Sequence, residues 1–285
     1  MTTLQLTRFS ANKFTCEENI KFNPETYSRF KFGCKDSARE FGMELAEKFI
    51  QSEDYAVMCA KLTAMQNRLI VMSSPYVHVP TATFAMKDYF IRSLNNQLVE
   101  DGLMPVMETK IYRKSSYKEE YGEMSKEERF NVMSNDTFYV DANLLKGNLR
   151  MFLDDIVITG AHEHRIVTML EKYNLHDHED NMFLYYAELT NHETNPKIEN
   201  YLNYYYVKDL VSLDKIIKNE PFIMNTRVVK YILDADHEQC KIFFNYQKYV
   251  FLHTLYHNAI GNGYHKIDDY LLNLNYLKTL LNNTY

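Results

Sequence analysis

Apolar residues recur at helical spacing near the start of the chain and again in its last third. The segment 29–50 predicts an amphipathic helix that opens the fold, because its apolar residues repeat every three or four positions: Ala38, Phe41, Leu45, Phe49 and Ile50. After about Asn195 similar periodicities return, for example in 243–255, where Gly261 and Gly263 follow. A final helix is expected over about Ile267–Leu281.

Short apolar runs lie between these helical stretches. Arg68–Met72 predicts a buried strand, and Thr81 or Thr83 then caps a helix that continues to about Leu98. Two further runs, Leu149–Leu153 and Met182–Leu189, predict strands of the same kind. Because strands and helices alternate, the pattern favours an α/β fold with a parallel sheet flanked by helices, followed by a mostly helical C-terminal region.

The change from alternating strands and helices to helices alone divides the chain into two parts. We expect an α/β domain over 1–195 and a helical region over 196–285 that covers a site, forms a dimer or binds a partner. Between about Lys110 and Asp136 the residues are mostly charged and polar, which predicts a mobile loop.

Length and composition narrow the protein class. The 285 residues, 46% of them hydrophobic, are enough for a sizeable core, and the formal net charge of -6 argues against general nucleic-acid binding. No apolar run approaches the ~18 residues of a membrane span. The four cysteines show no zinc spacing, so they are read as free thiols in a reducing compartment. We therefore expect a cytoplasmic protein that binds neither nucleic acid nor membrane.

The segment Arg150–Glu163, RMFLDDIVITGAHE, carries the most chemical information. An apolar strand delivers Asp154 and Asp155 to its end, and a short turn leads into a helix whose first amides follow Thr159. Free amides at a helix N-terminus bind phosphate, and carboxylates accept hydrogen bonds from ribose hydroxyls. The pattern alone equally fits an ordinary strand-to-helix connection whose acidic pair faces solvent.

This segment resembles the phosphoribosyl pyrophosphate (PRPP) signature of type I phosphoribosyltransferases. The shared pattern is a run of apolar residues, two adjacent acids, an apolar turn and Thr-Gly. Family members usually continue with a small residue and then Thr or Ser, where this chain has Ala161 and His162. With the helical tail, the form DDIVITGAHE looks most like phosphoribosyltransferases of bacterial stress-response and tellurite-resistance gene clusters.

The resemblance implies roles for individual residues. Asp154 and Asp155 would hold the ribose hydroxyls. The backbone around the 5′-phosphate would come from Thr159, Gly160, Ala161, His162 and Glu163. Mg²⁺ is the implied cofactor; it would be held mainly by pyrophosphate and water, with no direct protein ligand expected.

The pyrophosphate is expected at two further segments. Ser73, Ser74 and Tyr76 match the position of the family's pyrophosphate loop, and the polar loop would supply Arg113 and Lys114 as catalytic cations. Lys110 and Lys118 are substitutes in that role, and a solvated surface loop is the alternative reading.

Histidines at short spacing raise the question of a metal site. The pairs are His162 with His164, His176 with His178, and His253 with His257. The first pair points to opposite sides of a helix start, the second lies in a loop, and the third lacks the Glu of H-E-x-x-H. A dedicated metal site is therefore not expected.

The leading hypothesis is an enzyme of nucleotide metabolism: a Mg²⁺-dependent phosphoribosyltransferase that transfers phosphoribose from PRPP to a nitrogenous base or base-like small molecule and releases pyrophosphate. The alternative is a regulatory protein that binds PRPP or a nucleotide without turnover. In a third hypothesis the helical region binds a partner and the α/β part is a scaffold. Homodimerisation is left open.

Overall fold

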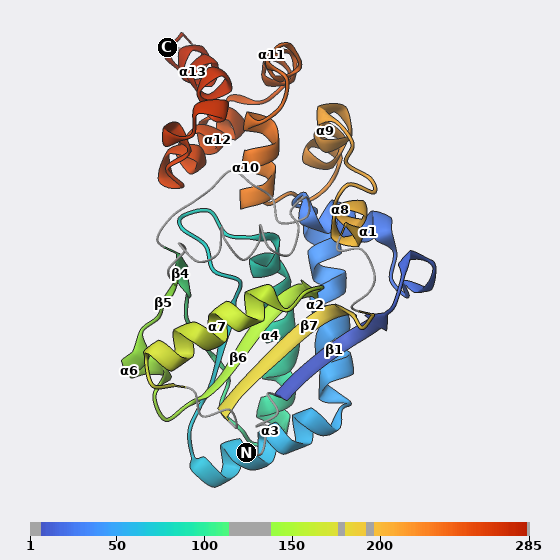
Figure 1. Cartoon of the computed structure of the whole chain (residues 1–285), viewed down its shortest axis with the longest axis vertical. Coiled ribbons are helices and arrows are strands. Elements are labelled where there is room, and N and C mark those ends of the chain that lie inside the picture. Colours follow the sequence, from blue (N-terminus) through green and yellow to red (C-terminus); the bar gives the residue numbers. More distant parts are fainter. Residues whose placement is uncertain (1–6, 114–137, 176–179, 192–196, 284–285) are drawn as a thin grey trace.

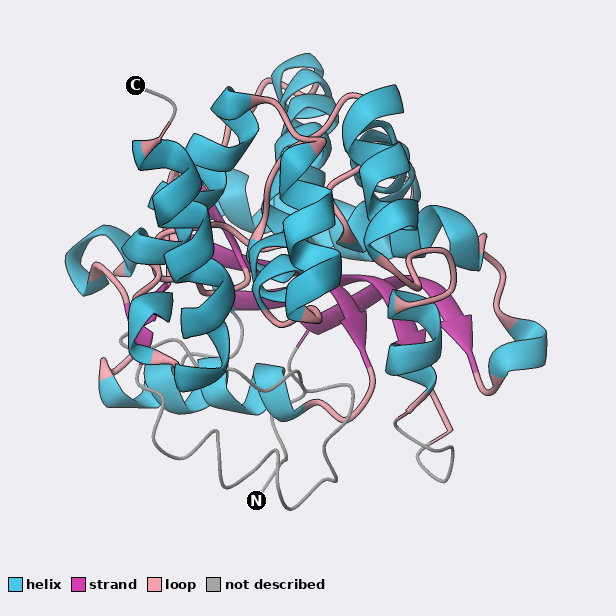
Figure 2. Cartoon of the chain, turned by 90° about the horizontal axis from the view of Figure 1, so that it is seen from above, coloured by secondary structure: helices cyan, strands magenta, loops and turns pink. Residues whose placement is uncertain are grey.

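The computed structural model describes residues 7–113, 138–175, 180–191 and 197–283. Within these residues, five strands form a parallel sheet in the order β1-β7-β6-β2-β3. Their bounds are Thr7–Phe14 (β1), Leu69–Ser73 (β2), Met107–Glu108 (β3), Leu149–Val157 (β6) and Asn181–Leu189 (β7). A short antiparallel pair, β4 (Tyr112–Arg113) and β5 (Phe138–Tyr139), lies outside this sheet. Helices on both sides of the sheet (Figure 2) confirm the expected α/β class.

The order of the strands creates a crevice between β2 and β6. From β2 the chain continues through α4 (Ala82–Glu100) to β3 on one side, whereas from β6 it continues through α7 (Ala161–Lys172) to β7 on the other. Parallel crossovers are right-handed, so connections that run in opposite directions place α4 and α7 on opposite faces of the sheet. The loops after β2 and β6 therefore diverge, which is where open α/β sheets bind ligands.

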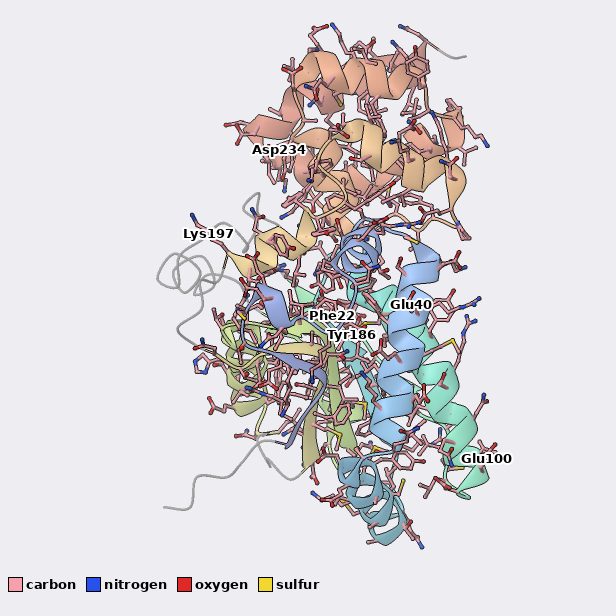
Figure 3. All side chains as sticks on the ribbon, turned by 90° about the vertical axis from the view of Figure 1, so that its right-hand side faces the viewer. Phe22, Glu40, Glu100, Tyr186, Lys197 and Asp234 are labelled. Atoms are coloured by element: carbon pink, nitrogen blue, oxygen red, sulfur yellow. The ribbon has the colours of Figure 1, made fainter. Side chains whose placement is uncertain are left out.

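One face of the sheet packs against α1 (Pro24–Lys31), α2 (Lys35–Ile50), α3 (Glu53–Met65) and α4. Aromatic rings fill the space beneath α2: Phe41 stacks on Tyr186 with ring centroids 4.1 Å apart, and Phe22 meets Tyr186 edge to face (Figure 3). Alternate strand residues reach this face because side chains in a strand point to opposite sides.

The other face carries α7 and the short helix α6 (Ala142–Leu145), as Figure 1 shows. The apolar side of α7 packs on strand residues of β2, β6 and β7. The pairing of Phe152 with Phe183, stacked at 5.1 Å, is part of this second core. Because helices cover both faces of the sheet, the strands consist of nearly continuous runs of apolar residues.

The helices after residue 197 lie beyond the carboxyl ends of the strands (Figure 1). They are α8 (Ile198–Asn203), α9 (Leu210–Asn219), α10 (Thr226–Leu233), α11 (His237–Asn245), α12 (Tyr249–Gly261) and α13 (Asp268–Asn282). We call residues 197–283 the helical region. Its core joins α9 to α13, whereas Ile198 and Leu202 of α8 belong to the core under the sheet. The division of the chain at residue 195 stays a prediction.

The helical region docks on a turn that interrupts the helix expected over 29–50. Two helices, α1 and α2, replace it, and Gly33 lies between them with φ +89°. The carbonyl of Gly33 accepts from the amide of Ile223 at 2.9 Å, and the amide of Lys35 donates to Pro221 at 2.8 Å. A side chain on Gly33 would come within 2.4 Å of the Ile223 carbonyl oxygen. The break is therefore caused by a contact with residues nearly 200 positions away.

Other boundaries also differ from the sequence-based expectation. The strand β1, and not a helix, begins the described fold, and α3 lacks an expected counterpart. The periodicity over 243–255 belongs to two helices, α11 and α12, that bury residues in one shared core. Periodicity reports which residues are buried, but it does not show where the chain turns between two helices. Within the described residues, no helix is long and apolar enough to cross a membrane.

We expect Gly33→Ala to lower the free energy of unfolding by about 1–3 kcal/mol, the usual cost of overpacking, in addition to the strain of its positive φ. Gly102→Ala is the matched control, because Gly102 has φ +74° but no atom within 4 Å of an added methyl group. Urea unfolding measures both variants. Equal destabilisation of the two would show that the contact with Ile223 is unimportant.

Candidate functional site

The two adjacent acids lie in the second half of β6 and point to opposite sides of the sheet. Strand β6 continues to Val157, and Asp154 still pairs with Tyr185 of β7, so the strand is longer than the run Leu149–Leu153 indicated. Alternation along the strand separates the two carboxylates. Their partners therefore differ, except for the Thr83 hydroxyl, which lies within hydrogen-bond distance of both.

Asp155 is buried, at 4% exposure, and faces α1 and α4. Its Oδ2 atom accepts from the Tyr27 hydroxyl and the Lys31 ammonium, both at 2.5 Å, and its Oδ1 accepts from the Thr83 hydroxyl at 3.2 Å. Burial, with the charge and the hydrogen bond of Asp155, raises the pKa of Tyr27 far above its usual value. Tyr27 is therefore a permanent donor, and Lys31 neutralises the buried charge.

Asp154 faces the crevice and α7. Its Oδ1 accepts from the Ser74 hydroxyl at 2.7 Å and from the Thr83 hydroxyl at 3.1 Å, while Oδ2 lies 2.6 Å from Nδ1 of His162. The amide of Asp155 also donates to Oδ1, at 3.0 Å. Burial alone would raise the pKa of Asp154, but the positive charge of His162 and these hydrogen bonds outweigh it and hold the pKa well below its usual range.

The N-terminus of α7 opens at the same place. Gly160 is its N-cap with φ +70°, a left-handed conformation that glycine adopts without strain, and α7 begins at Ala161. The amide of Ala161 donates to the hydroxyl oxygen of Thr159 at 3.4 Å. The amides of the first turn have no acceptor within the helix, so this end of α7 suits an anion.

Two side chains of this turn bind protein groups and do not point toward a common ligand. His162 reaches back to Asp154, as described above. Glu163 is buried and accepts from Arg8 of β1 at 2.6 and 3.0 Å and from the Tyr185 hydroxyl at 2.7 Å. Only the backbone of Glu163 is thus suited to the phosphate contact that the resemblance implies; its carboxylate fastens α7 to β1 and β7.

A pocket of about 240 Å³ joins these groups. It lies at the carboxyl ends of β2 and β6, the crevice described above. Its floor is formed by residues 154–163, and one wall by Ser74, Pro75 and Thr83. Arg113 and Phe138 of the β4–β5 pair line another side, and α8 and α10 of the helical region contribute Glu199, Thr226, Arg227 and Lys230.

The expected pyrophosphate segments are only partly gathered here. Ser74 and Arg113 line the pocket, whereas Ser73 is buried in β2 and Tyr76 pairs with Tyr112 away from the described lining. Lys110 donates to the carbonyl of Val77 at 2.6 Å, and its ammonium lies 3.9 Å from the centre of the Tyr76 ring. Lys114 and Lys118 lie outside the described residues.

Several site residues carried no signal in the sequence. Tyr27, Lys31 and Thr83 bind the carboxylates from α1 and α4, and Glu199, Arg227 and Lys230 belong to helices far along the chain. None of them forms a motif with the signature. Their proximity is decided by how α1 and α10 pack, which spacing along the chain does not encode.

The histidine pairs give no metal centre in the described part of the chain. No group of three or more His, Cys, Asp or Glu residues there is arranged to hold a metal ion. The Nε2 atoms of His253 and His257 lie 3.1 Å apart on the exposed side of α12. His176 and His178 lie outside the described residues.

A family comparison agrees with this geometry. The family model described as PRTase ComF-like matches residues 6–277, nearly the whole chain. The chain belongs to this family. The match extends through the helical region, so in this PRTase ComF-like protein α8 to α13 are part of the family's pattern and not an unrelated addition. No curated protein matches the chain.

Membership in the PRTase ComF-like family confirms the type I phosphoribosyltransferase-like fold that the signature implied. The roles of the individual site residues stay predictions. Most distinctive is His162, whose imidazole binds a signature carboxylate at the position where a hydroxyl was expected.

We expect Asp154→Asn to destabilise the protein in a pH-dependent way. The folded-state pKa of Asp154 is lowered, so its ionised form adds to stability above about pH 4, the unfolded value, and this contribution is lost as the pH falls further. The difference in unfolding free energy between the wild type and the variant should therefore shrink below about pH 4. Urea unfolding across pH measures it, with the exposed Asp268→Asn as control. A difference that does not vary with pH would contradict the assignment.

Proposed function

We propose that this PRTase ComF-like protein is a Mg²⁺-dependent phosphoribosyltransferase that transfers 5-phosphoribose from PRPP to a nitrogenous base or base-like acceptor and releases pyrophosphate. The observation that carries the proposal is the junction of β6 and α7. It combines carboxylates that can accept from hydroxyls with helix amides that can donate to a phosphate, in one pocket. PRPP is an intracellular metabolite, so the proposal places the protein in the cytoplasm and in nucleotide metabolism.

The proposed donor fits the pocket in three parts. The 5′-phosphate would lie on the amides of 161–163, and the ribose hydroxyls would face Asp154 and Asp155. The pyrophosphate would extend toward Ser74 and Arg113, which line the pocket on the side of β2 and β4. Lys114 would add charge there. Lys31 and Thr83 would orient the carboxylates from behind, because both already bind Asp155.

The oxygen atoms that line the pocket fit a Mg²⁺ ion that binds together with PRPP. Asp154 is partly exposed to the pocket and Glu199 lines it, and Mg²⁺ prefers such hard oxygen ligands together with phosphate and water. When bound, Mg²⁺ supplies positive charge that neutralises the leaving pyrophosphate. The hydrogen bonds already made to Asp154 support the expectation that pyrophosphate and water hold most of the ion's coordination sites.

The proposed reaction breaks the bond from ribose C1 to the pyrophosphate oxygen, which leaves with the bonding electrons. A bond from C1 to the acceptor nitrogen forms, and the nitrogen loses a proton to water or to a basic group. The transition state is similar to the oxocarbenium-like one of glycoside hydrolysis. Anchoring the ribose aligns the two partners, and Arg113 would stabilise the charge that develops on the leaving group.

A second candidate function is PRPP or nucleotide binding without turnover, as in a regulatory protein. One observation favours it: both oxygens of Asp154 already accept hydrogen bonds, from Ser74, Thr83 and His162. Ribose hydroxyls would have to replace some of these donors. Binding and turnover must therefore be measured separately.

Calorimetric titration with PRPP, with and without Mg²⁺, tests the donor site. We expect Mg²⁺-dependent binding in the micromolar range, weakened at least tenfold by Asp154→Asn and by Asp155→Asn, because a neutral amide offers the ribose hydroxyls one uncharged acceptor oxygen in place of two charged ones. Asp268→Asn on α13 is the control, since its side chain is exposed and distant from the lining residues. Unchanged binding in both site variants would contradict the assignment.

Pyrophosphate release with a panel of bases then separates the two candidates. We expect Arg113→Ala to reduce turnover more than PRPP binding, because leaving-group charge is largest in the transition state. Arg39→Ala, on the exposed side of α2, is the control. Tight PRPP binding with no pyrophosphate release from any acceptor would favour the regulatory candidate.

His162→Thr tests the residue that departs from the signature. We expect PRPP affinity to be preserved or improved, because a hydroxyl replaces the imidazole and Asp154 loses one competing partner. The same titration measures it. A tenfold loss of affinity would mean that the imidazole itself binds the ligand.

A further inference from the structure

The segment between β2 and α4 lines the pocket only at its two ends. Ser74 and Pro75 follow β2 and Thr81 precedes α4, and all three line the pocket, whereas the described lining includes no residue of 76–80. We call residues 74–81 the β2 loop. It belongs to no helix or strand and contains only the isolated bridge of Tyr76 with Tyr112. Contacts of its middle residues therefore decide how its ends meet a ligand.

Asn262, the residue that follows α12, binds the middle of the β2 loop. Its Oδ1 atom accepts from the amide of His78 at 3.0 Å and from the amide of Val79 at 2.9 Å. Its Nδ2 donates to the Tyr264 hydroxyl at 3.0 Å, and the residue is only 4% exposed. Two amides that converge on one atom need an acceptor there, so the oxygen and not the nitrogen of Asn262 must face the loop.

Thr226, the first residue of α10, binds the next part of the β2 loop. Its hydroxyl donates to the carbonyl of Val79 at 2.7 Å, and its amide donates to the carbonyl of Pro80 at 2.9 Å. The helical region thus binds both backbone groups of Val79. The Val79 side chain is also buried in the core of the helical region. This part of the loop is therefore packed as if it belonged to the helical region.

The start of the β2 loop is held from the opposite side. Lys110 donates to the carbonyl of Val77, and the Tyr76 ring packs edge to face on Phe84 of α4, with ring centres 5.9 Å apart. Each residue of 77–80 consequently has a backbone group bound by a residue outside the loop. The bonds from the helical region, added to those from Lys110, leave the loop little conformational freedom.

We propose that Asn262 and Thr226 are positioning residues for the pyrophosphate: they hold the β2 loop in the conformation in which Ser74 and the loop backbone meet the leaving group. The inference rests on the proposed function and gives the helical region a part in the donor site. Asn262 does not line the pocket, so it acts through the loop alone. A loop that is already fixed loses little freedom when the ligand binds, and fixed groups stabilise a developing charge best.

Ribose 5-phosphate provides the comparison that isolates this role, because it keeps the phosphate and ribose of PRPP but lacks the pyrophosphate. We expect the wild type to bind Mg²⁺-PRPP at least tenfold more tightly than ribose 5-phosphate in calorimetric titrations. Asn262→Leu and Thr226→Val remove the side-chain bonds to the loop, and each should reduce this preference at least fivefold. Affinity for ribose 5-phosphate should change less than twofold, because the contacts at β6 and α7 are left in place.

Conservative variants separate positioning from a merely structural role. Asn262→Asp keeps an oxygen for the two amides and Thr226→Ser keeps the hydroxyl, so both should retain the preference within twofold. Asn245→Leu and Thr254→Val, at exposed positions of α11 and α12, are matched controls that should also retain it. Thermal unfolding shows whether each variant is folded at the temperature of the titrations.

Hydrogen exchange tests the contact without any ligand. The amides of His78 and Val79 donate to Asn262, so we expect a peptide covering residues 77–81 to exchange at least tenfold faster in Asn262→Leu than in the wild type. The same peptide should stay protected in Asn262→Asp and in Asn245→Leu.

Three results would overturn the inference. One is a preference for Mg²⁺-PRPP that survives in both Asn262→Leu and Thr226→Val. Another is an equal loss of affinity for the two ligands, which would indicate damage to the whole pocket. The third is unchanged exchange of 77–81 in Asn262→Leu. Failure of the proposed function is distinct, because the wild type itself would then not bind Mg²⁺-PRPP, whatever the exchange of the loop.

Discussion

The need to neutralise two adjacent carboxylates at the end of a parallel strand organises this protein. An ionised group that leaves water must be paired and hydrogen-bonded, or it costs several kcal/mol. Asp155 is satisfied by Tyr27 and Lys31 of α1 and by Thr83 of α4, and Asp154 by Ser74 after β2 and by His162 of α7. Helices on both faces of the sheet and the end of β2 are thus joined at one point, which is also the floor of the pocket.

The helical region depends on the same point through α1. Lys31, the ion-pair partner of Asp155, lies at the end of α1, and its carbonyl accepts from Asn225 at the start of α10. The hydroxyl of Ser28 in α1 donates to Asn203 and accepts from the amide of Tyr206. A short helix therefore holds the carboxylates on one side and the roof of the pocket on the other. A movement of α10 would therefore be transmitted through Asn225 and Lys31 to Asp155.

Some features of the site follow directly from local sequence. The junction of β6 and α7 is encoded by an apolar run, a glycine and an amphipathic helix, so the strand, the turn and the exposed amides were predictable. The α/β fold class with a parallel sheet followed from the alternation of strands and helices. What local sequence did not indicate was that Glu163 turns away to Arg8 and Tyr185, or that His162 binds Asp154, because these contacts depend on the position of β1 and on the rotation of α7.

The sequence by itself determined the signature, the identity of its two acids and the helical character of the last third of the chain. Only the tertiary structure decided that the helix expected over 29–50 breaks at Gly33, that α1 supplies Tyr27 and Lys31 to the carboxylates, and that Arg227 and Lys230 reach the same pocket. The physical reason is that periodicity and motifs record burial and local backbone geometry. Pairing between charges as distant in sequence as Lys31 and Asp155 depends on how whole helices pack, and many sequences with the same local pattern would pack them differently.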